Sequence, residues 1–335
     1  MTFASSRFAG IGVFLPETRR TTPQTETDLR AANPSLKLAS GLIHRLTGVN
    51  SVHIRDEGWQ TSDLAVAAAR KALDESPGPI DLVIFASASQ DLIEPATSHI
   101  VAAKLGLDCP VMDVKNACNS VLNGLQVADA LIASGQYTRV LVASGEAPTS
   151  GVRWNLRDHQ QFIRSFPGFT MSDGGAAIIL ENTDDPATGI LDAKFLAVSS
   201  HWDIGTLPTG GSVNPRGGDD SFFDMDGAGL QAAFMDLGPQ PVIDLLERNN
   251  LEWDDFDLVA IHQVALPYLP PIFERLGVAG DKSVVIVGDH GNLASVGLPL
   301  QLQLAREQGK VAPGSLVLLI GLAGGISLGL MVVRL

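Results

Sequence analysis

The chain has 335 residues, of which 45% are hydrophobic and 18% are charged, and its net charge at pH 7 is −14. This composition favours a large buried core over disorder, and the negative charge argues against nucleic acid or an anionic membrane as the main partner. No apolar run approaches the roughly 20 residues of a membrane span, and we expect no signal peptide. The only cysteines, Cys109 and Cys118, cannot support a disulfide scaffold, so we expect a cytoplasmic location.

The first half of the chain alternates predicted strands and helices. Strands are expected over residues 7–15, 81–87, 111–114, 139–146 and 176–181, and helices over 61–73, 98–107 and 120–132. The strand at 139–146 is apolar on both faces, which is typical of a buried parallel sheet. Residues 152–169 read as irregular.

The second half repeats this alternation of strands and helices, with a helix predicted over 229–249 and strands over 257–262 and 284–287. Residues 257–262 resemble 81–86, and the glycine-led stretch 323–330 resembles 173–180. Chance similarity of αβ segments is the alternative, but both similarities occur in the same order. We therefore predict two similar αβ halves, 1–181 and 182–335, packed as one unit.

Cys118 is the first candidate for chemistry, because it falls where a strand gives way to a helix. The free N–H groups and the positive dipole end of a helix favour a thiolate, which suits a nucleophile. The alternative is a small buried cysteine that packs as a hydrophobic residue.

Two further candidates could stabilise negative charge on a carbonyl oxygen. His262 ends an apolar strand, where the carboxyl edge of a parallel sheet binds ligands, and Asn292 lies in a glycine-flanked turn before a helix. Both side chains can donate hydrogen bonds, so together they could polarise a thioester or stabilise an enolate. The alternatives are a satisfied core histidine and an ordinary turn or N-cap asparagine.

Gly324 and Gly325 allow a close backbone approach, and an N–H at this point could join the N–H of Cys118 in an oxyanion hole. A simple β-turn is the alternative. No dinucleotide or phosphate-loop fingerprint, no metal-ligand spacing and no Gly-x-Ser-x-Gly elbow is present. We therefore expect no metal and no tightly bound cofactor.

Several motifs together carry a family resemblance along nearly the whole chain. They are Asp113-Val114-Lys115-Asn116-Ala117-Cys118, Ser172-Asp173-Gly174-Gly175-Ala176-Ala177, Met225-Asp226-Gly227, His262-Gln263, Gly291-Asn292-x-Ala294-Ser295 and Ala323-Gly324-Gly325-x-Ser327-x-Gly329. The chain resembles the β-ketoacyl-acyl carrier protein synthase III-like enzymes of the thiolase superfamily. The resemblance implies a five-layer αβαβα thiolase fold with two pseudo-repeated halves and a homodimer.

For the site, the resemblance implies a Cys-His-Asn triad. Cys118 would be the acyl-thioester nucleophile, His262 and Asn292 would stabilise the enolate or thioester oxygen, and the N–H groups of Gly325 and Cys118 would form the oxyanion hole. The substrate would be a thioester of coenzyme A or phosphopantetheine, delivered as acyl-coenzyme A or by an acyl carrier protein.

The chain departs from the family where priming enzymes hold coenzyme A. Leu42 and Leu46 stand where a Trp and an Arg are expected, and Ala265 stands where an Asn often follows His-Gln. Four arginines could serve a phosphopantetheine donor in another way, although ordinary solvated charge is the alternative for each. They are Arg45, Arg153, Arg157 and Arg164.

Glu94 occupies the place of an aromatic residue that reaches into the partner's acyl pocket in priming enzymes. A carboxylate there resembles the branch that joins two acyl chains head to head, as in olefin and pyrone biosynthesis, where a Glu crosses the dimer and acts as a base. An apolar tunnel would make this carboxylate basic enough to remove an α-proton. The alternative is a surface Glu that precedes a helix.

The sequence therefore predicts a ketosynthase-type acyltransferase that forms an acyl-Cys118 thioester and a β-keto product in lipid or polyketide biosynthesis. Two alternatives remain: acyl transfer to an alcohol or amine without condensation, and a non-catalytic partner subunit of a heterodimeric synthase.

Overall fold

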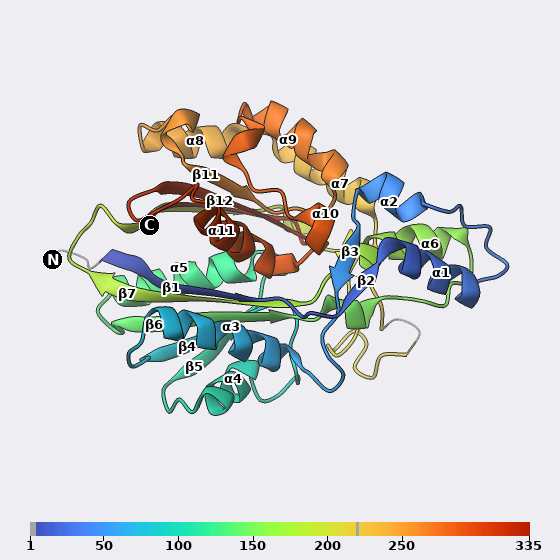
Figure 1. The fold of residues 1–335 in the computed structure, drawn as a ribbon, viewed down its shortest axis with the longest axis horizontal. Coiled ribbons are helices and arrows are strands. Elements are labelled where there is room, and N and C mark those ends of the chain that lie inside the picture. Colours follow the sequence, from blue (N-terminus) through green and yellow to red (C-terminus); the bar gives the residue numbers. More distant parts are fainter. Residues whose placement is uncertain (1–4, 219–220) are drawn as a thin grey trace.

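The computed structural model describes residues 5–218 and 221–335, which form two sheets and three helical layers (Figure 1). The strands are β1 Ser5–Phe14, β2 Arg19–Thr21, β3 Ser51–His53, β4 Leu82–Ala86, β5 Val111–Val114, β6 Arg139–Glu146, β7 Gly174–Thr183, β8 Gly189–Ala197, β9 Gly205–Thr206, β10 Asp224–Met225, β11 Leu258–Ile261, β12 Leu316–Ala323 and β13 Ser327–Arg334. The helices are α1 Thr22–Ala32, α2 Leu42–Thr47, α3 Thr61–Glu75, α4 Thr97–Leu105, α5 Ser120–Ala133, α6 His159–Ser165, α7 Gly227–Leu237, α8 Gln240–Arg248, α9 Leu269–Leu276, α10 Val287–His290 and α11 Gly297–Glu307.

The main sheets follow the same plan. The first has the strand order β1-β7-β6-β4-β5 and the second has the order β8-β13-β12-β11. In both, the first three strands are antiparallel neighbours and the next pairing is parallel. The two similar glycine-led stretches lead into the closing strands β7 and β13, and the other similar pair includes β4 and β11.

Helices separate and cover the sheets. In Figure 1, α5 and α11 lie between the two sheets, α3 and α4 cover the outer face of the first, and α8 and α9 cover the outer face of the second. This is the expected five-layer αβαβα arrangement. The strand β7 ends at Thr183 and β8 begins at Gly189 in the other sheet; the division into units 1–181 and 182–335 stays a prediction.

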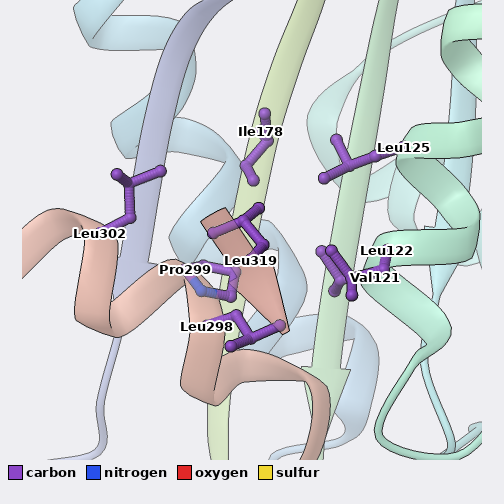
Figure 2. A pocket seen from close by; sticks show the side chains of 8 residues that line it. All are labelled: Val121, Leu122, Leu125, Ile178, Leu298, Pro299, Leu302 and Leu319. Carbon is purple, nitrogen blue, oxygen red and sulfur yellow. The ribbon is translucent and has the colours of Figure 1, made fainter. Parts of the chain in front are cut away.

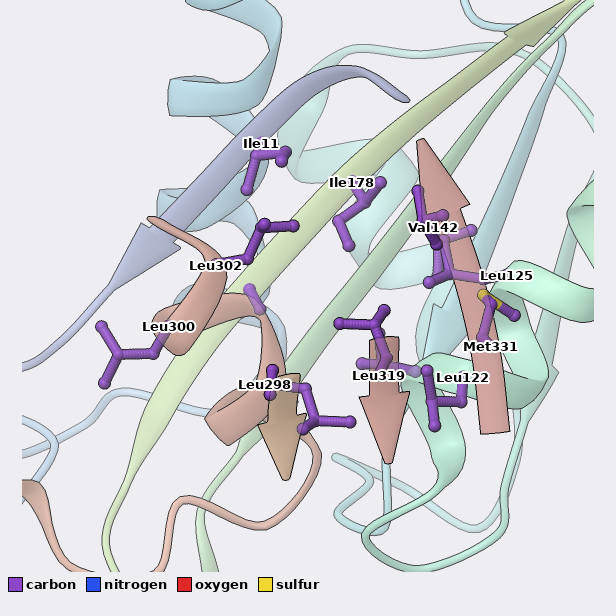
Figure 3. Close-up of a cluster of buried hydrophobic side chains, with 14 of the residues drawn as sticks. Ile11, Leu122, Leu125, Val142, Ile178, Leu298, Leu300, Leu302, Leu319 and Met331 are labelled. Carbon is purple, nitrogen blue, oxygen red and sulfur yellow. The ribbon is translucent and has the colours of Figure 1, made fainter. Parts of the chain in front are cut away.

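The central core joins the two halves (Figure 3). It contains Leu122 and Leu125 from α5, Leu298 and Leu302 from α11, and Leu319 from β12, all at most 3% exposed. Burial of a leucine side chain stabilises a fold by about 1.5–3 kcal/mol. Either half alone would expose this apolar inner face to water and lose that stabilisation.

A small cavity remains between the two central helices (Figure 2). Its lining side chains are Val121, Leu122, Leu125, Ile178, Leu298, Pro299, Leu302 and Leu319. Because all of them are apolar, the cavity offers no polar group that could orient a ligand, and it is a packing space rather than a binding site.

The structure corrects three local expectations. The helix predicted over 229–249 is broken into α7 and α8 at Gly238, whose φ is +66°, and Pro239. Residues 152–169 are not wholly irregular, because Asp158 caps α6 through a 2.8 Å hydrogen bond from the Gln161 N–H.

The third correction concerns residues 284–287, which form no strand. The side chain of Gln263 takes the place of a strand partner: its amide donates to the Val284 carbonyl at 2.8 Å, and its oxygen accepts from the N–H groups of Ile286 at 2.8 Å and Val287 at 3.1 Å. Once a side chain satisfies these main-chain groups, no ladder with β11 is needed.

Over residues 5–218 and 221–335, the chain has no helix that is long and apolar enough to cross a membrane.

Candidate active site

Cys118 lies in a tight turn between β5 and α5. The preceding Ala117 has a φ of +45°, and the Ser120 hydroxyl accepts a hydrogen bond from the Asn116 N–H at 2.9 Å and donates one to the Ala117 carbonyl at 2.7 Å. A positive φ is uncommon for a residue with a side chain, so these bonds hold the turn. The partly buried thiol therefore stands at a well-defined place.

The thiol is not activated in the way that the helix N-terminus suggested. Burial and the carboxylate of Glu146 raise the pKa of Cys118 to about 12, while a hydrogen bond from its own backbone N–H acts in the opposite direction. Desolvation and a nearby negative charge both disfavour a thiolate, so the expectation of a lowered pKa was wrong. The free protein holds a thiol at neutral pH.

The hairpin turn between β12 and β13 is tied to the Cys118 turn through Asn119. The Asn119 amide donates to the carbonyl of Ser327 at 3.1 Å and to its hydroxyl at 2.9 Å. Gly325, in the same hairpin, has a φ of +110°, a value that residues with a side chain rarely adopt. The glycine of the predicted oxyanion hole thus belongs to a turn that is fastened to the residue after Cys118.

His262 directly follows β11 and is held by its main chain, whose N–H donates to the Ile320 carbonyl at 2.8 Å. Its side chain is 6% exposed, and burial lowers the pKa of the ring to about 4. Within residues 5–218 and 221–335, neither ring nitrogen has a hydrogen-bond partner. A neutral imidazole always carries one N–H donor, so His262 can donate a hydrogen bond without carrying a charge.

Asn292 is held by three hydrogen bonds that leave its amide nitrogen unused. Its N–H donates to the Thr170 carbonyl at 2.8 Å, its carbonyl accepts from the Ser172 N–H at 2.9 Å, and its side-chain oxygen accepts from the Ala294 N–H at 3.0 Å. The turn role weighed for Asn292 is therefore present. The side chain is 6% exposed, and its Nδ2 has no protein partner in the described part of the chain.

The Asn292 loop and the Cys118 turn meet around Glu146, the last residue of β6. The Ser295 hydroxyl donates to the Glu146 carboxylate, and the charge of that carboxylate acts on the Cys118 thiol. These contacts, with the Asn119 and His262 bonds, bring the segments that carry Cys118, His262, Asn292 and Gly325 to one edge of the two sheets.

Glu94 lies apart from this group. It is exposed in the loop between β4 and α4, next to Leu92 and Ile93, which are 51% and 68% exposed. Within one chain Glu94 therefore has the surroundings of a surface residue.

The predicted donor-binding arginines have different environments. The guanidinium of Arg153 lies 4.7 Å from the centre of the Phe222 ring, and Arg164 forms an ion pair with Asp224. Arg45 and Arg157 are exposed. The four do not converge on one point through any shared contact in the part of the chain that is described.

Glu146 and Gln263 were missed as site residues. The signal for Glu146 was a single carboxylate at the end of an apolar strand, and the signal for Gln263 was a polar residue between His262 and a second apolar run. Neither pattern reveals the contacts, because the partners lie far away in the sequence. No cluster of three or more metal-ligating side chains occurs in residues 5–218 and 221–335.

Comparison with known families matches the chain in two regions. Residues 112–198 match the family described as 3-Oxoacyl-[acyl-carrier-protein (ACP)] synthase III, and residues 246–335 match its C-terminal part. A curated relative, the beta-ketoacyl-[acyl-carrier-protein] synthase III of Nitratidesulfovibrio vulgaris, is 32% identical over 340 residues, which cover 98% of both chains.

Solved structures share the fold over the full length. OleA of Xanthomonas campestris superposes with a TM-score of 0.89 at 23% identity and covers 100% of both chains. A structure of an OleA variant with bound lauric acid and lauroyl-CoA has the same TM-score and identity and covers 99% of this chain and 100% of its own. The 3-oxoacyl-[acyl-carrier-protein] synthase III of Aquifex aeolicus has a TM-score of 0.84 at 24% identity, over 98% of this chain and 100% of its own.

Proposed function

The chain belongs to the β-ketoacyl-[acyl-carrier-protein] synthase III family, and we propose that Cys118, His262 and Asn292 carry its chemistry. It is an acyltransferase of the condensing type, which joins acyl thioesters in lipid biosynthesis. The observation that carries the assignment of residues is the pair of free donors: His262 and Asn292 are each 6% exposed, and their side-chain nitrogens form no hydrogen bond within the described chain. A substrate oxygen can accept from both.

In the first half-reaction, Cys118 takes the acyl group. Its sulfur adds to the thioester carbonyl, the bond from that carbonyl to the donor sulfur breaks, and the thiol proton leaves with the coenzyme A or phosphopantetheine thiol. Because the resting pKa of Cys118 is about 12, ionisation has to accompany attack rather than precede it. The N–H groups of Cys118 and Gly325 would hold the oxyanion that forms on the carbonyl.

In the second half-reaction, His262 and Asn292 stabilise the enolate of the second thioester. The side-chain oxygen of Asn292 is occupied by the Ala294 N–H, so the amide nitrogen is the group available to donate. His262, with a ring pKa of about 4, is neutral and also donates. The enolate forms when the second thioester loses CO₂ from a malonyl group or an α-proton to a base. Its carbon attacks the acyl carbonyl, the bond to the Cys118 sulfur breaks, and the sulfur takes up a proton as the β-keto thioester is released.

The donor is expected to be anionic, and the charge distribution supports this. Residues 19–45 and 153–164 contain eight of the 23 Lys and Arg but only three of the 37 Asp and Glu. A local basic region in a chain with a net charge of −14 would attract the phosphates of coenzyme A or an acidic acyl carrier protein. Arg45 and Arg157 lie in this region and are exposed, so they are the stronger candidates among the four arginines.

We further propose a homodimer that uses the β5 edge. Among the described residues β5 pairs with β4 alone, and in the loop that follows β4 Leu92 and Ile93 expose large apolar side chains. An open strand edge next to apolar side chains favours pairing with another chain. A dimer formed there would bury Glu94, which could then act as the base that removes an α-proton in the partner's site and make the condensation non-decarboxylative, in specialised lipid or polyketide metabolism in the cytoplasm.

The test of Cys118 is intact-protein mass spectrometry after incubation with a panel of acyl-coenzyme A and acyl carrier protein donors. We expect one acyl adduct on the wild type and on Cys109→Ala, and none on Cys118→Ala. An equal adduct on Cys118→Ala, or no adduct with any donor, would support the non-catalytic alternative. An adduct that passes only to alcohols or amines would support acyl transfer without condensation.

Two variants test the dimer and the base. Ile93→Asp should produce a monomer in size-exclusion chromatography with light scattering, whereas Ile163→Asp, at a position that is 57% exposed on α6, should not. Glu94→Gln should retain the acyl adduct and lose condensation of two non-malonyl donors. If Glu94→Gln condenses them at the wild-type rate, Glu94 is a surface residue.

A further inference from the structure

The carboxylate of Glu146 is buried without an ion-pair partner. It is 0% exposed, and the groups that donate to it are neutral: they include the Ala88 N–H at 3.0 Å, the Ser89 hydroxyl at 3.0 Å and the Ser295 hydroxyl. Salt bridges in residues 5–218 and 221–335 do not include Glu146. Burial of an unpaired carboxylate costs several kcal/mol, and a structural role alone could be filled by an uncharged side chain.

The contacts of Glu146 join three segments that lie far apart in the sequence. One is the end of β6, one is the loop after β4 that contains Ala88 and Ser89, and one is the loop that contains Asn292 and Ser295. The Ser89 hydroxyl also accepts from the Ala147 N–H at 3.1 Å. The loop after β4 is therefore fastened to β6, and Ser295 extends this arrangement to the Asn292 loop.

Ser295 is itself held on two sides. Its hydroxyl donates to Glu146 and lies 3.0 Å from the hydroxyl of Ser144. Since Ser295 has one hydroxyl proton, the Ser144 hydroxyl is the donor in the second contact. Removal of Ser144 would thus leave the bond between Ser295 and Glu146 in place, which makes Ser144 a matched control.

We propose that Glu146 is a positioning residue, which fixes the Asn292 loop through Ser295 beside the Cys118 turn. The proposal rests on the proposed function of Asn292 as an oxygen-stabilising donor. Asn292 is three residues before Ser295, and an error of about 1 Å in the place of such a donor can lower a rate by as much as about 100-fold. Glu146 also acts on Cys118 through charge: its carboxylate raises the pKa of the thiol, and burial raises the pKa of Glu146 as well.

The two effects can be separated by two variants. Ser295→Ala removes the link to the Asn292 loop and keeps the carboxylate. Glu146→Gln removes the charge, while its side-chain oxygen can still accept from Ala88 and Ser295 and its amide can donate to Ser89. Positioning therefore predicts a loss in Ser295→Ala, and the charge effect predicts a change in Glu146→Gln.

The experiment compares wild type, Ser295→Ala, Ser144→Ala and Glu146→Gln, all in a Cys109→Ala background, with thermal unfolding as the check of folding. The rate of Cys118 acylation, the rate of condensation and the pH dependence of alkylation by iodoacetamide are measured for each. We expect Ser295→Ala to condense about tenfold more slowly with unchanged acylation, and Ser144→Ala to match the wild type. Glu146→Gln should be alkylated at a lower pH than the wild type.

The proposal is overturned if Ser295→Ala and Ser144→Ala have the same ratio of condensation to acylation as the wild type. It is also overturned if Ser295→Ala slows acylation and condensation equally, because that result indicates general damage rather than displacement of Asn292. Failure of the proposed function is distinguishable, since it would appear as an absence of acyl adduct on Cys118 in the parent protein of the same series.

Discussion

The two halves of the chain share one plan but complete it differently. The first sheet has a fifth strand, β5, after β4, whereas the second sheet stops at β11. At the equivalent place, residues 284–287 run beside Gln263, whose side chain binds three of their main-chain groups. The first half therefore ends in an open strand edge, which we propose pairs with a second copy of the chain, whereas in the second half Gln263 satisfies the segment that could otherwise have added a strand.

The halves also place different chemistry at equivalent junctions. The turn before α5 carries Cys118, and the loop before α11 carries Asn292. His262 follows β11, whereas Ser87 follows the equivalent β4, and its hydroxyl donates to the Gly145 carbonyl at 2.7 Å and accepts from the Ser89 N–H at 3.0 Å. In the proposed function each half therefore supplies one part of the site: the first half supplies the nucleophile and the second half supplies the oxygen-binding donors.

The glycine pairs of the two halves show the same divergence. A Cβ on Gly175 would lie 2.0 Å from the Leu64 carbonyl oxygen, so glycine is required for close packing of β7 on α3. A Cβ on Gly325 would meet nothing within 4 Å, but its φ is +110°. Equivalent glycines therefore have different roles: Gly175 allows close packing, and Gly325 allows an unusual backbone conformation.

The largest effect on condensation is expected from removal of an oxygen-binding donor in the second half. We expect His262→Ala and Asn292→Ala to lower condensation by about 100- to 1000-fold, the usual cost of an oxyanion donor, while acylation of Cys118 is largely retained. Rapid-quench mass spectrometry measures both steps, and His159→Ala, at an exposed position, is the control. Equal losses in acylation would show that the second half also serves the nucleophile.

The glycine comparison predicts different effects on stability. Gly175→Ala should lower the free energy of unfolding by about 3 kcal/mol because the new methyl group overlaps a carbonyl. Gly324→Ala should change it by less than about 0.5 kcal/mol, because its Cβ would lie 3.9 Å from the nearest atom. Urea denaturation followed by circular dichroism measures both, and a similar loss in the two variants would contradict the packing argument.

The main-chain groups of residues 284–287 depend on the Gln263 side chain for their hydrogen bonds. Gln263→Leu should lower the free energy of unfolding by about 3 kcal/mol, because it leaves Val284, Ile286 and Val287 with unpaired buried main-chain groups. Gln308→Leu, on the exposed end of α11, should have little effect. Hydrogen exchange of the Ile286 and Val287 amides should accelerate in Gln263→Leu alone; unchanged protection would mean that another group holds this segment.

The two halves should also share a response to acid. Burial lowers the ring pKa of His53 and of His262 to about 4 from 6.5. An unfolded histidine then binds protons more tightly than the folded one, so stability is complete above pH 6.5 and falls as the pH drops from 6.5 toward 4. For His262 the loss at pH 5 is about 2 kcal/mol.

Thermal unfolding between pH 7 and pH 5 tests this prediction. His262→Gln and His53→Gln should each show a smaller decrease in unfolding temperature over this range than the wild type. A wild-type unfolding temperature that is independent of pH across the range would indicate that neither ring is neutral because of burial.

Much of the fold and some of the site were accessible from the sequence. Apolar periodicity located α3, α5, β4, β6 and β11 to within a few residues, because each depends on local patterns of burial. The two repeated segments predicted a second half with the same plan, and the strand–turn–helix pattern placed Cys118 between β5 and α5. These features follow from residues that are neighbours in the chain.

The protonation of Cys118 and the hydrogen bonds around the site depend on residues that are distant in the sequence. The charge that raises the pKa of Cys118 comes from Glu146, 28 residues later, and the bond that holds the Asn292 loop ends on the same carboxylate. The predicted strand at 284–287 failed because Gln263, more than 20 residues earlier, satisfies its main chain. Periodicity reports which residues are buried, whereas protonation and pairing depend on which distant groups share that buried space.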